Sequence, residues 1–184
     1  MLRAVVARPV SIILVGPMGC GKTAVGRAVA RLLSRDFFDT DRYVEERTGV
    51  DISFIFEKEG EAGFRRRESE AIKHFSRQSE IVLATGGGAI LGEENRAALM
   101  AAGFVVYLKA SVDSQYDRTR QSKSRPLLEK GDLRETIEHL MQQRAPLYES
   151  VADMAVNTDG RRVIQVAKDI VRQLHKEGMT TARA

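Results

Sequence analysis

The sequence predicts an α/β fold in three layers, with a parallel sheet between two layers of helices. Short apolar runs alternate along the chain with longer segments whose apolar residues recur at helical spacing. This alternation is typical of parallel sheets joined by right-handed crossovers. The chain has 184 residues and shows no internal repeat or inter-domain linker. We therefore expect residues 1–184 to form one domain with a substantial core.

The expected strands and helices follow from these patterns in chain order. The five expected strands are residues 10–15, 36–39, 81–84, 104–108 and 154–157. The longer expected helices are residues 22–35, 61–77, 93–102, 132–144 and 163–174. Two shorter helices are expected to end at Gly49 and at Gly60, and Ser111 is expected to cap a further one. Residues 1–9 and the tail after Lys176 are expected to be weakly ordered.

Composition narrows the classes of function. Hydrophobic residues make up 43% and charged residues 29% of the chain, as in ordinary soluble proteins. The net charge of +4 suits acidic small substrates at least as well as nucleic acid, for which no binding module is recognisable. A single cysteine excludes an intramolecular disulfide, and no apolar run is long enough to span a membrane. We expect a cytoplasmic monomer that binds neither nucleic acid nor membrane.

Residues 16–23 match the phosphate-binding pattern G-x-x-x-x-G-K-[ST] and follow the first expected strand directly. The backbone N–H groups of these residues can point at anionic oxygens, and the N-terminus of the helix that follows favours negative charge. Lys22 supplies a positive charge for the β- and γ-phosphates, and the Thr23 hydroxyl can bind Mg²⁺. This phosphate loop predicts binding of a nucleoside triphosphate.

Asp39 and Asp41 come directly after the second expected strand. If the strand geometry continues, they project to the same side of the sheet. One aspartate could complete a Mg²⁺ site with Thr23, and the other could accept the proton of a hydroxyl that attacks the γ-phosphate. The alternative is that both aspartates cap the next helix.

Gly86, Gly87 and Gly88 follow the third expected strand, where a conventional site of this kind would carry an aspartate. Three consecutive glycines are unfavourable in any regular element. Close approach of a ligand to the backbone would explain them. A flexible turn is the alternative.

Several arginines are candidates for binding anions. Arg65 lies one helical turn before Glu68, which could hold its guanidinium as a clamp for a carboxylate, and Arg144 at an expected helix end is a second candidate. Residues 118–131 are polar and suggest a mobile lid, from which Arg125 could reach the phosphates. For Arg65, the alternative is a helix face that is exposed to solvent. For residues 118–131, the alternative is an ordinary surface loop.

Taken together, the motifs resemble those of the shikimate kinase family. The matching stretches are residues 16–23, 38–41, 47–52, 60–65 with Glu68, 85–89, 125–128 and 144–148. The resemblance runs from about Val10 to Leu174. It implies the P-loop fold of the nucleoside monophosphate kinases, with a five-stranded parallel sheet in the order 2-3-1-4-5. It also implies a substrate-binding segment at about residues 40–77 and a lid at about residues 118–131.

The resemblance implies ATP-dependent phosphorylation of the 3-hydroxyl of shikimate, with Mg²⁺ as cofactor, in aromatic amino-acid biosynthesis. It assigns ATP to Gly19, Cys20, Gly21, Lys22, Thr23, Ala24, Arg118, Arg125 and Arg161. It assigns shikimate to Asp41, Arg65, Gly86, Gly87, Gly88 and Arg144, and Mg²⁺ to Thr23 and Asp39. Asp41, Lys22 and Arg125 are the expected catalytic residues. The rival interpretation is another small-metabolite kinase of the same fold, for gluconate or a nucleoside monophosphate.

Overall fold

The computed structural model describes residues 10–120 and 132–179. The expected N-terminal extension, most of the expected lid with Arg125, and the last five residues lie outside the described residues. The strands are β1 (Ser11–Val15), β2 (Phe37–Asp39), β3 (Val82–Ala84), β4 (Gly103–Lys109) and β5 (Met154–Asn157). They form one parallel sheet in the order β2-β3-β1-β4-β5, which confirms the predicted fold class.

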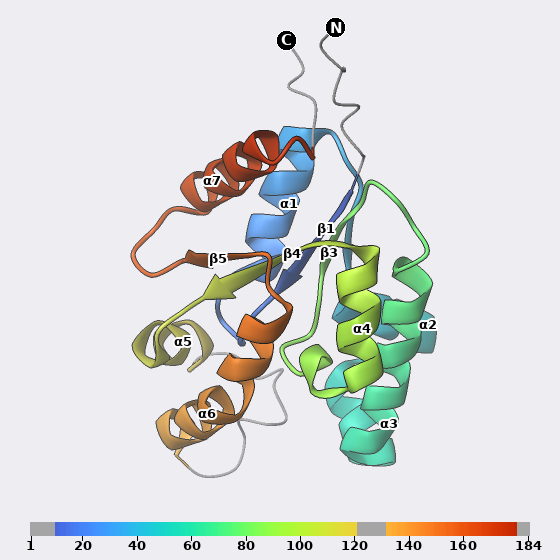
Figure 1. Ribbon diagram of the computed structural model, residues 1–184. Coiled ribbons are helices and arrows are strands. Elements are labelled where there is room, and N and C mark those ends of the chain that lie inside the picture. The colour runs from blue at the N-terminus through green and yellow to red at the C-terminus, as the bar shows by residue number, and fades with distance from the viewer. Residues whose placement is uncertain (1–9, 121–131, 180–184) are drawn as a thin grey trace, which may run out of the picture.

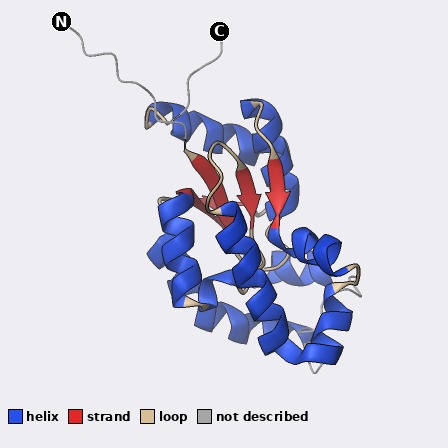
Figure 2. Ribbon diagram, turned by 90° about the vertical axis from the view of Figure 1, so that its right-hand side faces the viewer, coloured by secondary structure: helices blue, strands red, loops and turns tan. Residues whose placement is uncertain are grey.

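The helices lie on both faces of this sheet (Figures 1 and 2). They are α1 (Lys22–Leu33), α2 (Thr40–Thr48), α3 (Ile52–Phe75), α4 (Glu93–Ala102), α5 (Val112–Thr119), α6 (Leu133–Val151) and α7 (Val163–Lys176). A short 3₁₀ helix, η1 (Ala89–Leu91), follows β3 and was not expected from the sequence.

Alternate residues of the central strand β1 enter two separate cores. Ile12 and Leu14 pack with α1 and α7, whereas Ile13 and Val15 pack with α3, α4 and α6. Strand side chains alternate between faces, so a strand that is apolar throughout must be covered on both sides. Burial on both faces therefore explains why β1 is an unbroken apolar run.

A third, smaller core joins α2 to α3 beside the sheet. It contains Val44 from α2 and Ile55, Phe64 and Ala71 from α3. Within α3, Gly60 has φ of 68° and interrupts the helical backbone. The helix break expected at Gly60 is thus present as a kink between two helical parts, and both parts contribute to this core.

The structure corrects two expectations about element ends. Strand geometry does not continue past Asp39, because the Asp39 carboxylate accepts the N–H groups of Asp41 and Arg42 and starts α2 at Thr40. Asp41 therefore lies in the first turn of a helix.

The second correction concerns α6, which was expected to end at Arg144 but continues through Pro146 to Val151. A proline inside a helix removes one hydrogen bond. Tyr148 and Val151 beyond it are nonetheless buried in the core under α6, and this packing keeps the segment helical.

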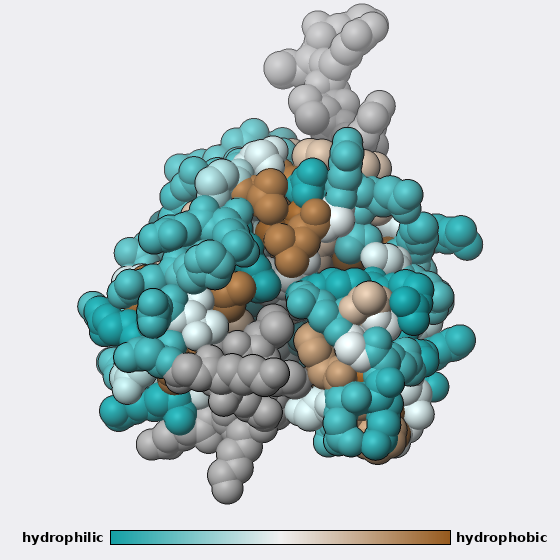
Figure 3. Space-filling model, turned by 90° about the horizontal axis from the view of Figure 1, so that it is seen from below, coloured by the Kyte–Doolittle hydropathy of each residue, from teal (hydrophilic) through white to brown (hydrophobic). Residues whose placement is uncertain are grey.

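Hydrophobic side chains on the surface are scattered. Leu32, Phe54, Leu91, Met100, Val163 and Ile164 are the large apolar residues that are exposed in the described part of the chain. On the face in Figure 3, hydrophilic residues predominate and hydrophobic ones form only a few patches. Among the described helices, none combines the length and apolar character that crossing a membrane requires.

Candidate active site

The phosphate loop connects β1 to the N-terminus of α1 and borders a cavity of about 490 Å³. The Lys22 ammonium donates to the carbonyls of Gly16 and Pro17 at 2.7 and 2.8 Å. Cys20 is buried, and its Sγ lies 3.5 Å from Lys22 Nζ. The loop thus presents a cation and a helix N-terminus to the same cavity, an arrangement suited to a polyphosphate.

Thr23 and Asp39 bring two oxygen atoms together beside the phosphate loop. Thr23 Oγ1 donates to Asp39 Oδ2 at 2.8 Å, while Asp39 Oδ1 caps α2. The capping alternative therefore holds for Asp39, but only for one of its two oxygens. The described residues contain no cluster of three or more metal-binding side chains. Two hard oxygens nevertheless fit Mg²⁺, which usually binds few protein groups and keeps waters and substrate phosphates as its other ligands.

Asp41 is half-buried at the cavity, and its Oδ1 atom is fully buried without a hydrogen-bond partner. Burial is the main cause that raises the pKa of this carboxyl to about 7, and the nearby carboxylates of Glu68 and Asp39 add to the effect. Lys22 and Arg65 oppose the shift. Asp41 is therefore a carboxyl that can exchange a proton near neutral pH.

The Arg65 guanidinium is held by two carboxylates of its own helix. It donates to Glu68 Oε2 at 2.7 Å and to Glu61 Oε1 at 2.9 Å. Burial lowers the pKa of Arg65, but the two carboxylates outweigh burial and raise it. Arg65 thus remains cationic and fixed, as its spacing from Glu68 predicted. Arg66 is exposed, and Arg67 pairs with Glu59, so the three adjacent arginines have different surroundings.

Arg144 reaches the same cavity from α6. It is only 5% exposed, and its Nε atom is buried without a hydrogen-bond partner. Glu68 is fully buried, and its Oε1 atom also lacks a partner. Because buried polar atoms in proteins are normally hydrogen-bonded, unpartnered atoms around a cavity indicate a place where a polar ligand binds.

The glycine loop, Gly86–Gly88, approaches these groups closely. A Cβ atom built on Gly86 would lie 2.3 Å from Glu68 Oε1 and 2.7 Å from Asp41 Oδ1. One built on Gly88 would lie 2.3 Å from both terminal nitrogens of Arg65. The glycines therefore make room for the polar side chains of the cavity itself, a role that the sequence did not predict.

Arg118 and Arg161 lie away from the cavity, next to the loop after β5. Arg118, on α5, donates to the carbonyl of Gly19 at 3.0 Å and to that of Thr158 at 3.1 Å. Arg161 pairs with Asp169 of α7 and donates to the carbonyl of Asn157 at 3.3 Å. Arg118 thereby connects the phosphate loop to the loop that contains Arg161.

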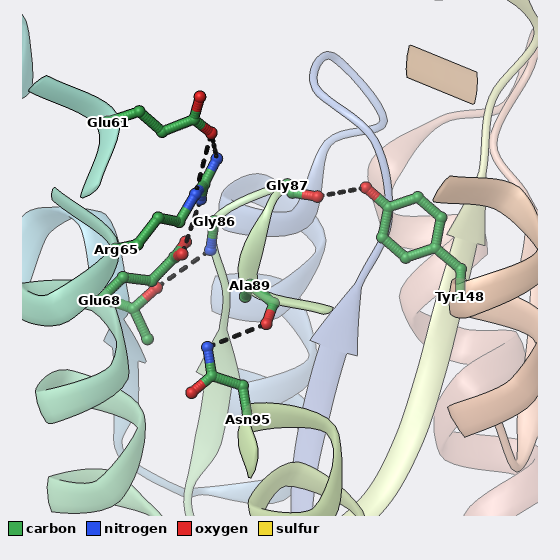
Figure 4. A network of polar contacts seen from close by, with 9 residues as sticks. Glu61, Arg65, Glu68, Gly86, Gly87, Ala89, Asn95 and Tyr148 are labelled. Atoms are coloured by element: carbon green, nitrogen blue, oxygen red, sulfur yellow. Dashed lines mark hydrogen bonds and ion pairs between the residues drawn. The ribbon is translucent and has the colours of Figure 1, made fainter. Parts of the chain in front are cut away.

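Sequence reasoning missed two groups of residues. Ile52, Phe56 and Phe64 give the cavity an apolar wall. Asn95 and Tyr148 hydrogen-bond the backbone around the glycine loop (Figure 4). Thr40 does so as well, and no spacing in the sequence signals these long-range contacts.

The raised pKa of Asp41 predicts a pH-dependent stability. An unfolded aspartate loses its proton near pH 4 and the folded one near pH 7, so stability falls as the pH rises through this window. Asp41→Asn removes the penalty and should stabilise the protein above pH 7, by at most about 4 kcal/mol and less because the residue is only half-buried. Denaturant unfolding from pH 4 to pH 8 in magnesium-free buffer checks this. A constant difference between the two proteins across this range would contradict the assignment.

Comparisons with known proteins point to one family. The family model described as "Shikimate kinase" matches residues 18–175. A shikimate kinase from Legionella pneumophila is 47% identical over 91% of this chain and 95% of that protein, and one from Shewanella denitrificans is 49% identical over 89% and 96%.

Among solved structures, shikimate kinase from Acinetobacter baumannii in complex with shikimate superimposes with a TM-score of 0.90 at 43% identity, covering 92% of this chain and 94% of that one. None of these findings favours the rival kinases for gluconate or a nucleoside monophosphate. The chain belongs to the shikimate kinase family, enzymes that transfer a phosphoryl group from ATP to a hydroxyl of shikimate.

Proposed function

We propose that this chain phosphorylates the 3-hydroxyl of shikimate with ATP, giving shikimate 3-phosphate and ADP, and that the cavity beside the phosphate loop is where it does so. The observation that carries the proposal is the pair of buried, unpartnered atoms Asp41 Oδ1 and Arg144 Nε around one cavity. An acceptor with a hydroxyl at one end and a carboxylate at the other would satisfy both. The reaction belongs to aromatic amino-acid biosynthesis.

The donor half of the site is the phosphate loop. Backbone N–H groups of Gly19, Cys20, Gly21 and Ala24 would surround the phosphates at the N-terminus of α1, and Lys22 would neutralise the β- and γ-phosphates. Mg²⁺, when bound at Thr23 and Asp39, would neutralise charge on the β- and γ-oxygens. ATP is therefore held by groups that do not contact the acceptor.

Asp41 would face the acceptor hydroxyl. A carboxyl whose pKa is raised to about 7 can take up the hydroxyl proton at neutral pH, and its unpartnered oxygen can orient the hydroxyl toward the γ-phosphate. The water-restricted surroundings that raise this pKa also strengthen the electrostatic interactions there.

Arg65 and Arg144 would bind the shikimate carboxylate from two sides. Arg65 is kept in place by Glu61 and Glu68, so its position is set before the substrate arrives. The apolar wall formed by Ile52, Phe56 and Phe64 would contact the carbon ring, and Gly87 would lie against it. A small hydroxy acid fits such a mixed lining better than a nucleotide base does.

Arg118 and Arg161 are proposed to border the adenine. Arg118 already contacts Gly19 of the phosphate loop, and Arg161 belongs to the neighbouring loop after β5. Arg125, in the proposed lid at residues 118–131, would stabilise charge on the phosphates as the lid excludes water. The segment at residues 40–77 includes Asp41 and Arg65, and we propose that it binds the substrate.

The acceptor is the first point to test. We expect ADP release from ATP and Mg²⁺ to be stimulated by shikimate and not by gluconate, AMP or quinate. A coupled ADP assay with each acceptor at equal concentration measures this. Absence of stimulation by shikimate would overturn the proposal, and stimulation by gluconate or AMP would favour the rival kinases.

Arg65→Ala should raise the KM for shikimate about 10- to 100-fold, because a charge-assisted contact contributes about 1.5–3 kcal/mol. The KM for ATP should change little. Arg66→Ala is the matched control, since it removes a neighbouring arginine that is exposed to solvent. Equal loss of affinity for both substrates would contradict the proposed role of Arg65.

Asp41→Asn should lower kcat by a factor of about 10² to 10⁴, the range typical of general acid–base groups. The variant should still bind nucleotide, because Asp41 does not belong to the phosphate loop. Steady-state kinetics and titration with an ATP analogue measure the two properties. Near-normal turnover would exclude Asp41 as base or orienting group.

A further inference from the structure

Three buried side chains from three helices hold the backbone around the glycine loop, and Figure 4 shows two of them, Asn95 and Tyr148. Thr40 Oγ1 of α2 accepts the N–H of Gly86 at 3.0 Å, and Asn95 Nδ2 of α4 donates to the carbonyl of Ala89 at 3.1 Å. The hydroxyl of Tyr148 on α6 donates to the carbonyl of Gly87. Thr40 and Tyr148 have no solvent exposure, and the bonds of Thr40 and Asn95 are buried away from competing water.

Gly87 differs from its two neighbours in what it faces. Where Gly86 and Gly88 face the charged side chains of the cavity, a Cβ built on Gly87 would lie 3.5 Å from Met18 N and 3.6 Å from Gly16 O. Both are backbone atoms of the phosphate loop. Gly87 therefore lies where the loop after β3 comes close to the phosphate loop, so its position should affect the distance between the two proposed substrates.

Tyr148 is itself firmly placed. Its ring is fully buried and stacks on Tyr107 with a centroid distance of 5.0 Å and an interplanar angle of 25°. It lies one turn after Arg144 on α6. One helix thus presents both an arginine to the cavity and a hydroxyl to the glycine loop, and packing of the ring fixes the direction of that hydroxyl.

We propose that Tyr148 is a positioning residue for phosphoryl transfer that acts through the carbonyl of Gly87. The bond holds the glycine loop at the separation from the phosphate loop that aligns the acceptor hydroxyl with the γ-phosphate. This inference rests on the proposed function. Without the bond the loop is free to shift, and a misplacement of about 1 Å can cost about 10²-fold in rate.

Tyr148→Phe tests the inference because it removes one oxygen and keeps the stacked ring. We expect kcat to fall about 10- to 100-fold, whereas the KM values for shikimate and ATP stay within about threefold of wild type. The KM values persist because Arg65, Arg144 and the phosphate loop still bind the substrates. This pattern is the opposite of that expected for Arg65→Ala, and a purely structural role would not produce it.

Tyr107→Phe is the matched control. It removes the same atom from the ring that stacks on Tyr148, and the Tyr107 hydroxyl donates no hydrogen bond to any described residue. It should keep wild-type kinetics, and the thermal midpoints of both variants should lie within about 3 °C of wild type.

Unchanged kcat in Tyr148→Phe would overturn the inference. A loss of kcat accompanied by a matching loss of ATP-analogue affinity and a clearly lower thermal midpoint would also overturn it, in favour of a structural role. A wild-type protein without shikimate-dependent ADP release would instead overturn the proposed function.

Discussion

The proposed acceptor half of the site depends on a carboxylate that has no contact with solvent. Glu68 is fully buried, and a buried charge is tolerated only when it is paired. Its partner, Arg65, lies one turn earlier on α3, so the pair forms within one helix and the guanidinium faces Gly88. The second oxygen of Glu68 faces Gly86 beside Asp41. One buried group thus fixes a cation and raises the pKa of a neighbouring acid.

The three glycines after β3 are explained by the same close packing of charged side chains. β3 ends at the edge of the sheet where β1 and β2 also end, so the chain after β3 must pass between the phosphate loop and α3. Side chains at Gly86 and Gly88 would occupy the space of Asp41, Glu68 and Arg65. Glycine is needed here because the protein's own charged groups occupy the space in which a Cβ would lie.

The features that the sequence predicted well depend on neighbours in the chain. The order of strands and helices follows from periodicity, and the fixed position of Arg65 follows from its three-residue spacing to Glu68. The phosphate loop is similar, since Lys22 bonds carbonyls only five and six residues earlier. Family resemblance supplied the rest of the site list, including the strand order.

The features that the sequence did not reveal depend on distant neighbours. Tyr148 and Gly87 are 61 residues apart, and Arg118 and Gly19 are 99 apart. The continuation of α6 past Pro146 likewise depends on the core that buries Tyr148. Local propensity cannot reveal such contacts, because tertiary packing decides them.

The distinction between near and distant neighbours in the chain also separates the proposed donor half of the site from the proposed acceptor half. In the proposed function one loop and one helix end bind the donor, so a short motif would be enough to encode that half. The cavity proposed for the acceptor is lined by residues from α2, α3, α6 and the loop after β3, and their relative positions depend on the whole core. Recognition of ATP can therefore be shared by many proteins of this fold. In the proposed function, selectivity for the acceptor would depend on how these elements pack, and Tyr148 is proposed as one of the residues through which that packing positions the glycine loop.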